Sequence, residues 1–393
     1  MSLTRVFPWL GVLALLCTGC PRQPEPPPPP PLPRLSVEEV ERLIPPGKTE
    51  RRGWAEDVLA AFGTHGLWPD APAVCSVLAV IEQESGFVAN PAVPRLAAIV
   101  RAELEEKLAG LGPARKPVLA QLLSGKAPGA KQTFQQRLDK VRTEQDLDRL
   151  YRDLLDHYRA EFPNAYQAAN LASSLAGKSS LEEQNPITTA GSMQVSVSFA
   201  RALAARLKRD GWAVRDALYT RRGGVDYGTA RLLGYSADYP QPVYRFADYN
   251  AGFFASRNAA LQVQLTELTG LPLAIDGDLL AYGKDGKPLA QESNTLRALL
   301  QFRERLAPGL SEWTLRREVK KEKAQAFEET ETWRTLQRVY RERTGKEWTY
   351  ARLPDVTLES PKLQQQRSTA WFARNVNLRF EKCMGRRAKA APR

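Results

Sequence analysis

The sequence predicts a mainly α-helical protein. Apolar residues recur at helical intervals through most of the chain, capping patterns such as Ser36-Val-Glu-Glu39 precede such stretches, and a single short stretch has the pattern of a β-hairpin. With 393 residues, 43% hydrophobic and 25% charged, the composition is that of a globular protein. It excludes collagen-like, wholly disordered and polytopic membrane proteins. The length corresponds to two domains, or to one large domain with an insertion.

The N-terminus predicts export. Residues 1–19 carry Arg5 and then a twelve-residue apolar run that is too short to span a bilayer, as in a signal peptide. Thr18-Gly19 before Cys20 resembles a bacterial lipobox, although Cys17 stands where an aliphatic residue is usual. We expect Cys20 to be lipidated; the alternative is an ordinary signal peptide with Cys20 as a bystander. Because Pro21 rather than Asp follows, the resemblance implies an outer-membrane anchor facing the periplasm.

Residues 20–35 form a proline-rich tether, with nine prolines between Pro21 and Pro33. Such a tract favours polyproline II, and thirteen residues would reach ~40 Å as a semi-rigid spacer. A proline-rich ligand for a partner domain is the competing interpretation. Two cysteines remain in the mature chain, Cys75 and Cys383. In an oxidising periplasm they can form one disulfide; two buried free thiols are the alternative.

The remaining helical stretches follow in order. We expect helices at 36–44, 54–62 (with Gly63 just past its end), 70–86 (capped by Asp70), 96–111, 132–162, 192–209, 224–233, 242–268, 294–306, 311–323 and 330–343, and a hairpin at 279–290. Residues 96–180 are expected to be an amphipathic helical hairpin or small bundle, in which His157 is a partly exposed helix residue. The basic tail, with Arg386, Arg387, Lys389 and Arg393, is expected to be frayed.

Three short segments stand out for their chemistry. Ile81-Glu-Gln-Glu-Ser-Gly-Phe87 ends an apolar helix, Ala190-Gly-Ser-Met-Gln-Val195 is expected to open the next one, and Asp248-Tyr-Asn-Ala-Gly252 lies in the middle of a helical stretch. A carboxyl at the end of an apolar helix that lines a cleft is where desolvation would raise the pKa, so that the group can act as a general acid near neutral pH; a solvated helix-end carboxylate is the alternative. Glu84 fits this description. Glu82, two residues away, is rotated by ~200° and faces the other way.

In this order the three segments resemble the soluble lytic transglycosylases of the lysozyme superfamily. Gly224-Val-Asp-Tyr-Gly228 leading into Ala230-Arg-Leu-Leu233 is similar to the family's intervening helix. The resemblance covers about residues 70–95 and 188–265. It implies a lysozyme-like domain over 36–270 with a helical insertion at about 96–180. Residues 271–393 would then be a helical C-terminal extension with the hairpin.

The resemblance also implies a reaction. The family cleaves the bond between N-acetylmuramic acid and N-acetylglucosamine in peptidoglycan, using one glutamate as acid and then as base and closing a 1,6-anhydro ring without water. Here Glu84 would be that residue, and Tyr249 would donate a hydrogen bond to its carboxylate. Substrate-binding residues would follow by position: Ser85, Ser192, Met193, Gln194 and Asn250. The motif regions contain no obvious paired carboxylate, which agrees with this scheme.

The partners implied are peptidoglycan strands and a membrane through the lipid anchor, with protein partners unspecified. We expect no cofactor and no metal, because two histidines and four cysteines cannot build a zinc cluster. The net charge of +12 fits an anionic partner, but no nucleic-acid recognition motif is present. The alternative from another class is a non-catalytic wall-binding or envelope-assembly lipoprotein on the same scaffold.

Overall fold

The computed structural model describes residues 32–175, 180–208, 211–283, 286–358 and 367–390. The chain divides into two compact units, 1–33 and 34–393, and the account below concerns the second. The expected signal peptide and its lipidation at Cys20 lie outside the described residues, as does the tether up to residue 31. In the part of the chain that is described, no helix is both long and apolar enough to cross a membrane.

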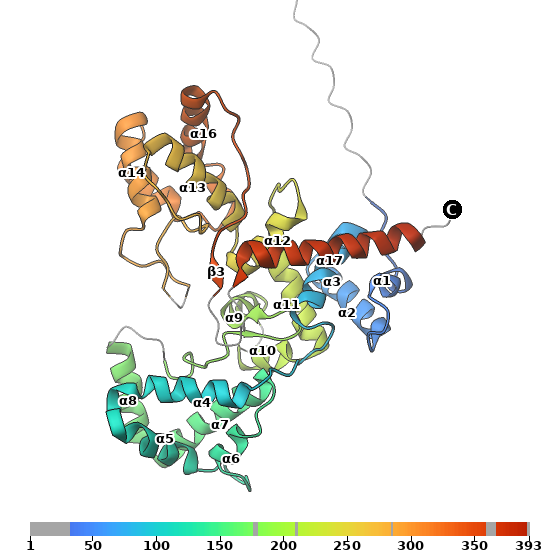
Figure 1. The fold of residues 1–393 in the computed structure, drawn as a ribbon, viewed down its shortest axis with the longest axis vertical. Helices are drawn as coiled ribbons and strands as arrows, with labels where there is room; N and C mark the ends of the chain where they lie inside the picture. Colours follow the sequence, from blue (N-terminus) through green and yellow to red (C-terminus); the bar gives the residue numbers. More distant parts are fainter. Residues whose placement is uncertain (1–31, 176–179, 209–210, 284–285, 359–366, 391–393) are drawn as a thin grey trace, which may run out of the picture. The chain divides into compact units, whose positions relative to one another are not determined.

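The prediction of a mainly α-helical protein is confirmed (Figure 1). The α-helices are α1 (Val37–Leu43), α2 (Arg51–Thr64), α3 (Ala71–Glu84), α4 (Leu96–Lys107), α5 (Arg115–Ser124), α6 (Phe134–Leu138), α7 (Glu144–Glu161), α8 (Pro163–Leu175), α9 (Val197–Arg206), α10 (Gly211–Leu218), α11 (Arg221–Leu233), α12 (Pro242–Ala251), α13 (Ala255–Thr269), α14 (Asn294–Leu306), α15 (Glu312–Val319), α16 (Glu331–Thr344) and α17 (Thr369–Ala390). Two 3-10 helices are η1 (Ala109–Ala114) and η2 (Gln325–Phe327).

The strands are very short and pair locally. Strand β1 (Thr189–Ala190) pairs antiparallel with β2 (Val195–Ser196), and β3 (Thr357–Leu358) pairs antiparallel with β4 (Arg367–Ser368). The hairpin expected at 279–290 is present as a single antiparallel bridge between Tyr282 and Pro288. Residues 284–285 at its tip lie outside the described residues.

Two helix starts confirm the capping predictions. At α1, the Ser36 hydroxyl accepts from the Glu39 backbone N–H, and the Glu39 carboxylate accepts from the Ser36 N–H at 2.7 Å. At α3, the Asp70 carboxylate accepts from the Ala73 N–H at 2.8 Å. These caps satisfy N–H groups that a helix start leaves unpaired. The Asp70 cap fixes where α3 begins, and α3 then runs to its last residue, Glu84.

Several predicted helices were wrong in their boundaries. The stretch 132–162 is two helices, because Thr143 starts α7 with a capping box of its own, exchanging hydrogen bonds with Asp146. The stretch 242–268 is also two, because the chain turns at Gly252 with φ 121°. The helix expected over 96–111 ends at Lys107 and passes into η1. Gly63 lies inside α2 rather than past its end.

The C-terminal tail up to residue 390 was also predicted wrongly, whereas Arg393 lies outside the described residues. Residues 369–390 form the long helix α17, which packs against α3 and α12 (Figure 1). Its buried residues Phe372, Ala373 and Val376 belong to the first hydrophobic core, together with residues of α1 to α7 and α9 to α12. Basic residues at the end of a helix look frayed in sequence, but Arg386 donates to the Leu43 carbonyl at 2.6 Å. A second core lies among α13 to α16.

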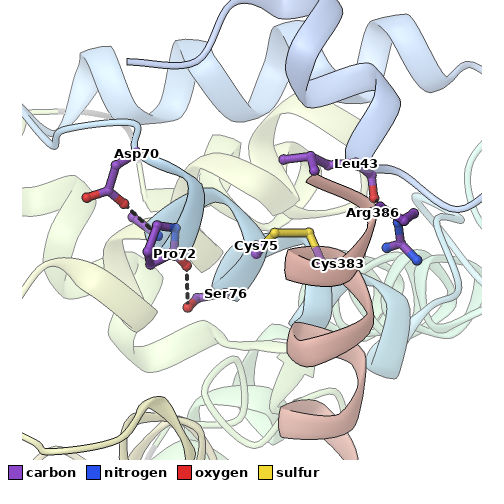
Figure 2. The surroundings of a disulfide bond; sticks show 8 residues. Leu43, Asp70, Pro72, Cys75, Ser76, Cys383 and Arg386 are labelled. Carbon is purple, nitrogen blue, oxygen red and sulfur yellow. Dashed lines mark hydrogen bonds between the residues drawn. A yellow bond between two sulfur atoms is a disulfide. The ribbon is translucent and has the colours of Figure 1, made fainter. Parts of the chain in front are cut away.

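A disulfide joins α3 to α17. Cys75 and Cys383 are bonded, with Cα atoms 5.6 Å apart and both side chains buried (Figure 2). This settles the choice that the sequence left open. The bond closes a loop across 308 residues, so it ties the end of the chain to the helix that carries Glu84.

We expect a Cys75→Ala, Cys383→Ala variant to lose about 3 kcal/mol of unfolding free energy, because a disulfide that closes a long loop restricts the unfolded chain. Chemical denaturation of the oxidised proteins measures this loss. As a control, a reducing agent should destabilise the wild type and leave the double variant unchanged. Equal stability of wild type and variant would contradict the prediction.

Candidate functional site

The three segments singled out in the sequence come together in the structure. Glu84 ends α3, the Gly191–Gln194 segment forms the turn between β1 and β2, and Tyr249 lies near the end of α12. The Tyr249 hydroxyl donates to the Met193 carbonyl at 2.7 Å, which joins the second segment to the third. The Glu84 charge acts on Tyr249, which joins the first segment to the third.

Glu84 is the chemically distinctive group of this site. Burial raises its pKa to about 8; the charge of Glu144 adds to this, and that of Arg379 opposes it. Its side chain keeps some exposure, and among the described residues its carboxyl makes no hydrogen bond. A carboxyl with this pKa carries a proton at neutral pH and has it available to donate.

The chain leaves α3 by a tight turn. The Ser85 hydroxyl, expected to bind substrate, donates instead to the Ile81 carbonyl at 3.1 Å, so Ser85 closes the helix end. Gly86 and Phe87 follow with φ 60° and 70°. Phe87 is not glycine, and a left-handed backbone costs such a residue about 1–2 kcal/mol. Its buried ring packs edge-on against Trp54, 5.5 Å away, and this contact helps to hold the turn.

The Gly-Ser-Met-Gln segment was expected to begin a helix, but it is a β-turn, and α9 starts only at Val197. Gly191 has φ 81°, and a Cβ there would lie 2.1 Å from the Leu218 carbonyl oxygen. Only glycine fits this position. The close approach brings the turn down onto the loop after α10, and the local β pairing replaces the expected helical start.

Ser192 and Met193 do not line a cleft with their side chains, contrary to expectation. Both are fully buried. They fill space against α11 where a Cβ on Gly224 would lie 2.7 Å from the Ser192 hydroxyl, and one on Gly228 2.2 Å from the Met193 sulfur. Both side chains therefore pack the turn on the face of α11 that carries Gly224 and Gly228. Met193 contributes its carbonyl to the site rather than its side chain.

Gln194 is held in one orientation. Its backbone is left-handed, with φ 50°. Its amide nitrogen donates to the Glu144 carboxylate at 2.9 Å, and its amide oxygen accepts from the Thr189 hydroxyl at 3.0 Å. The side chain therefore links the β-turn to α7, across the boundary between the expected domain and its insertion.

Glu144 is the site residue that sequence analysis missed. It begins α7, is 4% exposed, and raises the pKa of Glu84. The three motif segments contain no paired carboxylate, as expected, but the folded protein brings Glu144 from outside them to act on Glu84. The Thr143-x-x-Asp146 capping box could have located the helix start at Glu144. Nothing in the sequence could have located that start beside Glu84.

Tyr249 and Asn250 differ from their expected contacts. The Tyr249 hydroxyl donates to Met193 and not to the Glu84 carboxylate, although burial and the Glu84 charge both raise its pKa. Asn250 is exposed, and its amide oxygen accepts from the Thr369 hydroxyl at 2.9 Å, at the start of α17. The preceding Asp248 is fully buried and accepts from the Tyr235 and Tyr239 hydroxyls.

The C-terminal helix brings a cation to the site. Arg379 of α17 lowers the pKa of Glu84, against the larger effect of burial. Glu82 interacts instead with Arg386, which lies about two helical turns after Arg379 on α17. The two glutamates thus interact with different residues of α17.

In the described part of the chain, no group of three or more His, Cys, Asp or Glu side chains could hold a metal ion. His65 pairs with Asp226 at 3.0 Å, and the His157 ring packs on Phe134. The site described above therefore consists of a neutral acid, a phenol, an amide, a second carboxylate and a guanidinium. Groups of this kind can donate and accept protons.

Comparisons with known proteins place the chain in a family. It is 36% identical to the Escherichia coli (strain K12) protein named "Uncharacterized protein YaiW" over 389 residues, which cover 98% of this chain and all of the relative. No solved structure matches the chain. A family model described as "Protein of unknown function (DUF1615)" matches residues 47–386. The chain therefore belongs to the DUF1615 family.

Proposed function

We propose that this protein is a peptidoglycan lytic transglycosylase with a lysozyme-like catalytic domain. The observation that carries the proposal is the raised pKa of Glu84, about 8, in a partly exposed residue at the end of an apolar helix. The contact of Tyr249 with the Gly-Ser-Met-Gln turn supports it, because that contact unites two of the three segments that resemble the family.

The proposed reaction uses Glu84 twice. As acid, Glu84 gives its proton to the oxygen that links C1 of N-acetylmuramic acid to O4 of N-acetylglucosamine, and that C1–O bond breaks. The muramic acid 6-hydroxyl then bonds to C1, and its proton returns to Glu84. Atoms balance without water, and the product is a 1,6-anhydro sugar. A pKa near the working pH suits a group that must both donate and accept.

The proposed location is the cell envelope, with Cys20 lipidated in the outer membrane and the proline-rich tether holding the folded part away from it. The net charge of +12 favours approach to the wall, whose peptide stems are acidic. The Cys75–Cys383 disulfide fits an oxidising compartment.

A second candidate is a non-catalytic wall-binding or envelope-assembly lipoprotein. It is favoured by the burial of the Ser192 and Met193 side chains and by the hydrogen bond between Asn250 and Thr369, since these residues are then less available to a sugar. A pocket of about 670 Å³ that is lined by Tyr244, Gln264, Asp355 and Arg374, among others, does not include Glu84. A binding role would use such surfaces instead.

Replacement of Glu84 tests the enzyme. We expect protein lacking residues 1–36 to release 1,6-anhydromuropeptides from purified sacculi, and Glu84→Gln to reduce the rate at least ~100-fold because it removes the proton donor. Mass spectrometry of the digests measures both. Glu82→Gln is the matched control on the same helix and should retain activity. Products with reducing ends would indicate a hydrolase, and binding to sacculi without any product would favour the second candidate.

The raised pKa also predicts a pH-dependent stability change. Glu84 ionises near pH 4.5 when unfolded and about pH 8 when folded. The wild type therefore loses stability as the pH rises through this window, and the full penalty applies above pH 8. Glu84→Gln carries no such penalty. Thermal unfolding should show the variant more stable than wild type at pH 9, with the gain vanishing near pH 4.

The exposed Glu161 on α7 provides the control for this measurement, and Glu161→Gln should follow the wild type at both pH values. A constant difference between Glu84→Gln and wild type across the pH range would mean that the Glu84 carboxyl ionises normally in the folded protein.

A further inference from the structure

The helical insertion contributes a residue to the candidate site. Glu144 is the first residue of α7, held there by the Thr143 cap, and it is almost wholly buried. One carboxylate oxygen accepts the Gln194 amide at 2.9 Å, and the Glu144 backbone carbonyl lies 3.5 Å from the Tyr219 hydroxyl. A buried carboxylate is costly unless it is hydrogen-bonded. Glu144 interacts with the segment that contains Gln194 and with the segment that contains Glu84, so we considered which function its carboxylate could have there.

We propose that Glu144 is a positioning residue of this site: its carboxylate fixes the Gln194 side chain and presents a negative charge to Glu84. The inference rests on the proposed function and extends it to the insertion. Residues 96–180 would then contribute to the catalytic site, and would not be only an addition on the surface of a smaller domain.

The electrostatics around Glu84 support this role. Glu84 interacts electrostatically with Glu144 of α7, with Arg379 of α17 and with the Tyr249 phenol of α12. Two carboxylates that share a site resist being ionised together, so Glu144 favours the protonated form of Glu84 and Arg379 favours the ionised form. Arg231 faces Tyr249, and Tyr219 faces Glu144.

This arrangement would help both halves of the reaction. Before bond cleavage, burial and the Glu144 charge together keep a proton on Glu84, which the leaving oxygen then takes. After cleavage, Glu84 is an anion beside a second anion, so it regains a proton more readily, and the 6-hydroxyl supplies that proton. Gln194, held by Glu144 and Thr189, cannot swing away from the turn during these steps.

The test compares Glu144→Gln with Glu161→Gln, a control at the other end of the same helix. Carbon-detected NMR of glutamate-labelled protein follows the Glu84 carboxyl through a pH titration, assigned with Glu84→Gln. We expect Glu144→Gln to lower the Glu84 midpoint by about one pH unit. In the pH–rate profile measured on sacculi, the basic limb should shift to lower pH by the same amount. Glu161→Gln should leave both unchanged.

An unchanged Glu84 midpoint in folded Glu144→Gln would overturn the proposal, even if activity fell, because a purely structural role would lower activity without moving the titration. If Glu144→Gln does not fold, Glu144→Asp replaces it, because the shorter side chain moves the carboxylate away from Glu84 by the length of one methylene group. The midpoint of the Glu84 titration should then fall by a smaller amount, and no fall would overturn the proposal. The titration needs no substrate. A wild type that releases no product would therefore refute the enzyme while leaving the titration to decide the role of Glu144.

Discussion

The burial of α3 is the constraint on which the rest of this structure depends. Its apolar residues Val74, Val77, Leu78 and Ile81 are almost fully buried, so the helix needs cover on every side. Helices α11 and α17 pack against it, and the disulfide at Cys75 fastens α17 in place. The last turn of α3 keeps partial exposure, but the Glu84 carboxyl there is desolvated by burial. The raised pKa of Glu84 is thus a direct consequence of how this helix is enclosed.

The site is assembled from distant parts of the chain by a few close approaches. Glycines at positions 191, 224 and 228 let the β1–β2 turn lie directly on α11 and on the loop after α10, so that the Met193 carbonyl can meet the Tyr249 hydroxyl. The insertion and the C-terminal helix then add charges of opposite sign, Glu144 and Arg379. Their opposing effects leave burial as the main cause of the Glu84 pKa.

Much of the helical pattern could be predicted, because caps and apolar spacing act locally. The capping boxes at Ser36 and Thr143 and the cap at Asp70 are all formed by residues three positions apart. Breaks such as Gly252 and the turn at Gly191 were missed, since each is decided by contacts with other elements. Helix α17 was missed because its apolar residues are spaced among basic ones, and its partners α3 and α12 lie more than a hundred residues earlier.

By itself, the sequence determined the helical class, the starts of α1 and α3, the position of Glu84 at the end of a helix and its separation from Glu82. These follow from steric and hydrogen-bonding rules that operate within a few residues. Only the tertiary structure decided the Cys75–Cys383 bond, the inward burial of Ser192 and Met193, the hydrogen bond from Tyr249 to Met193, and the presence of Glu144 and Arg379 beside Glu84. The reason is that desolvation and charge act through space, between side chains that the order of residues along the chain does not bring together.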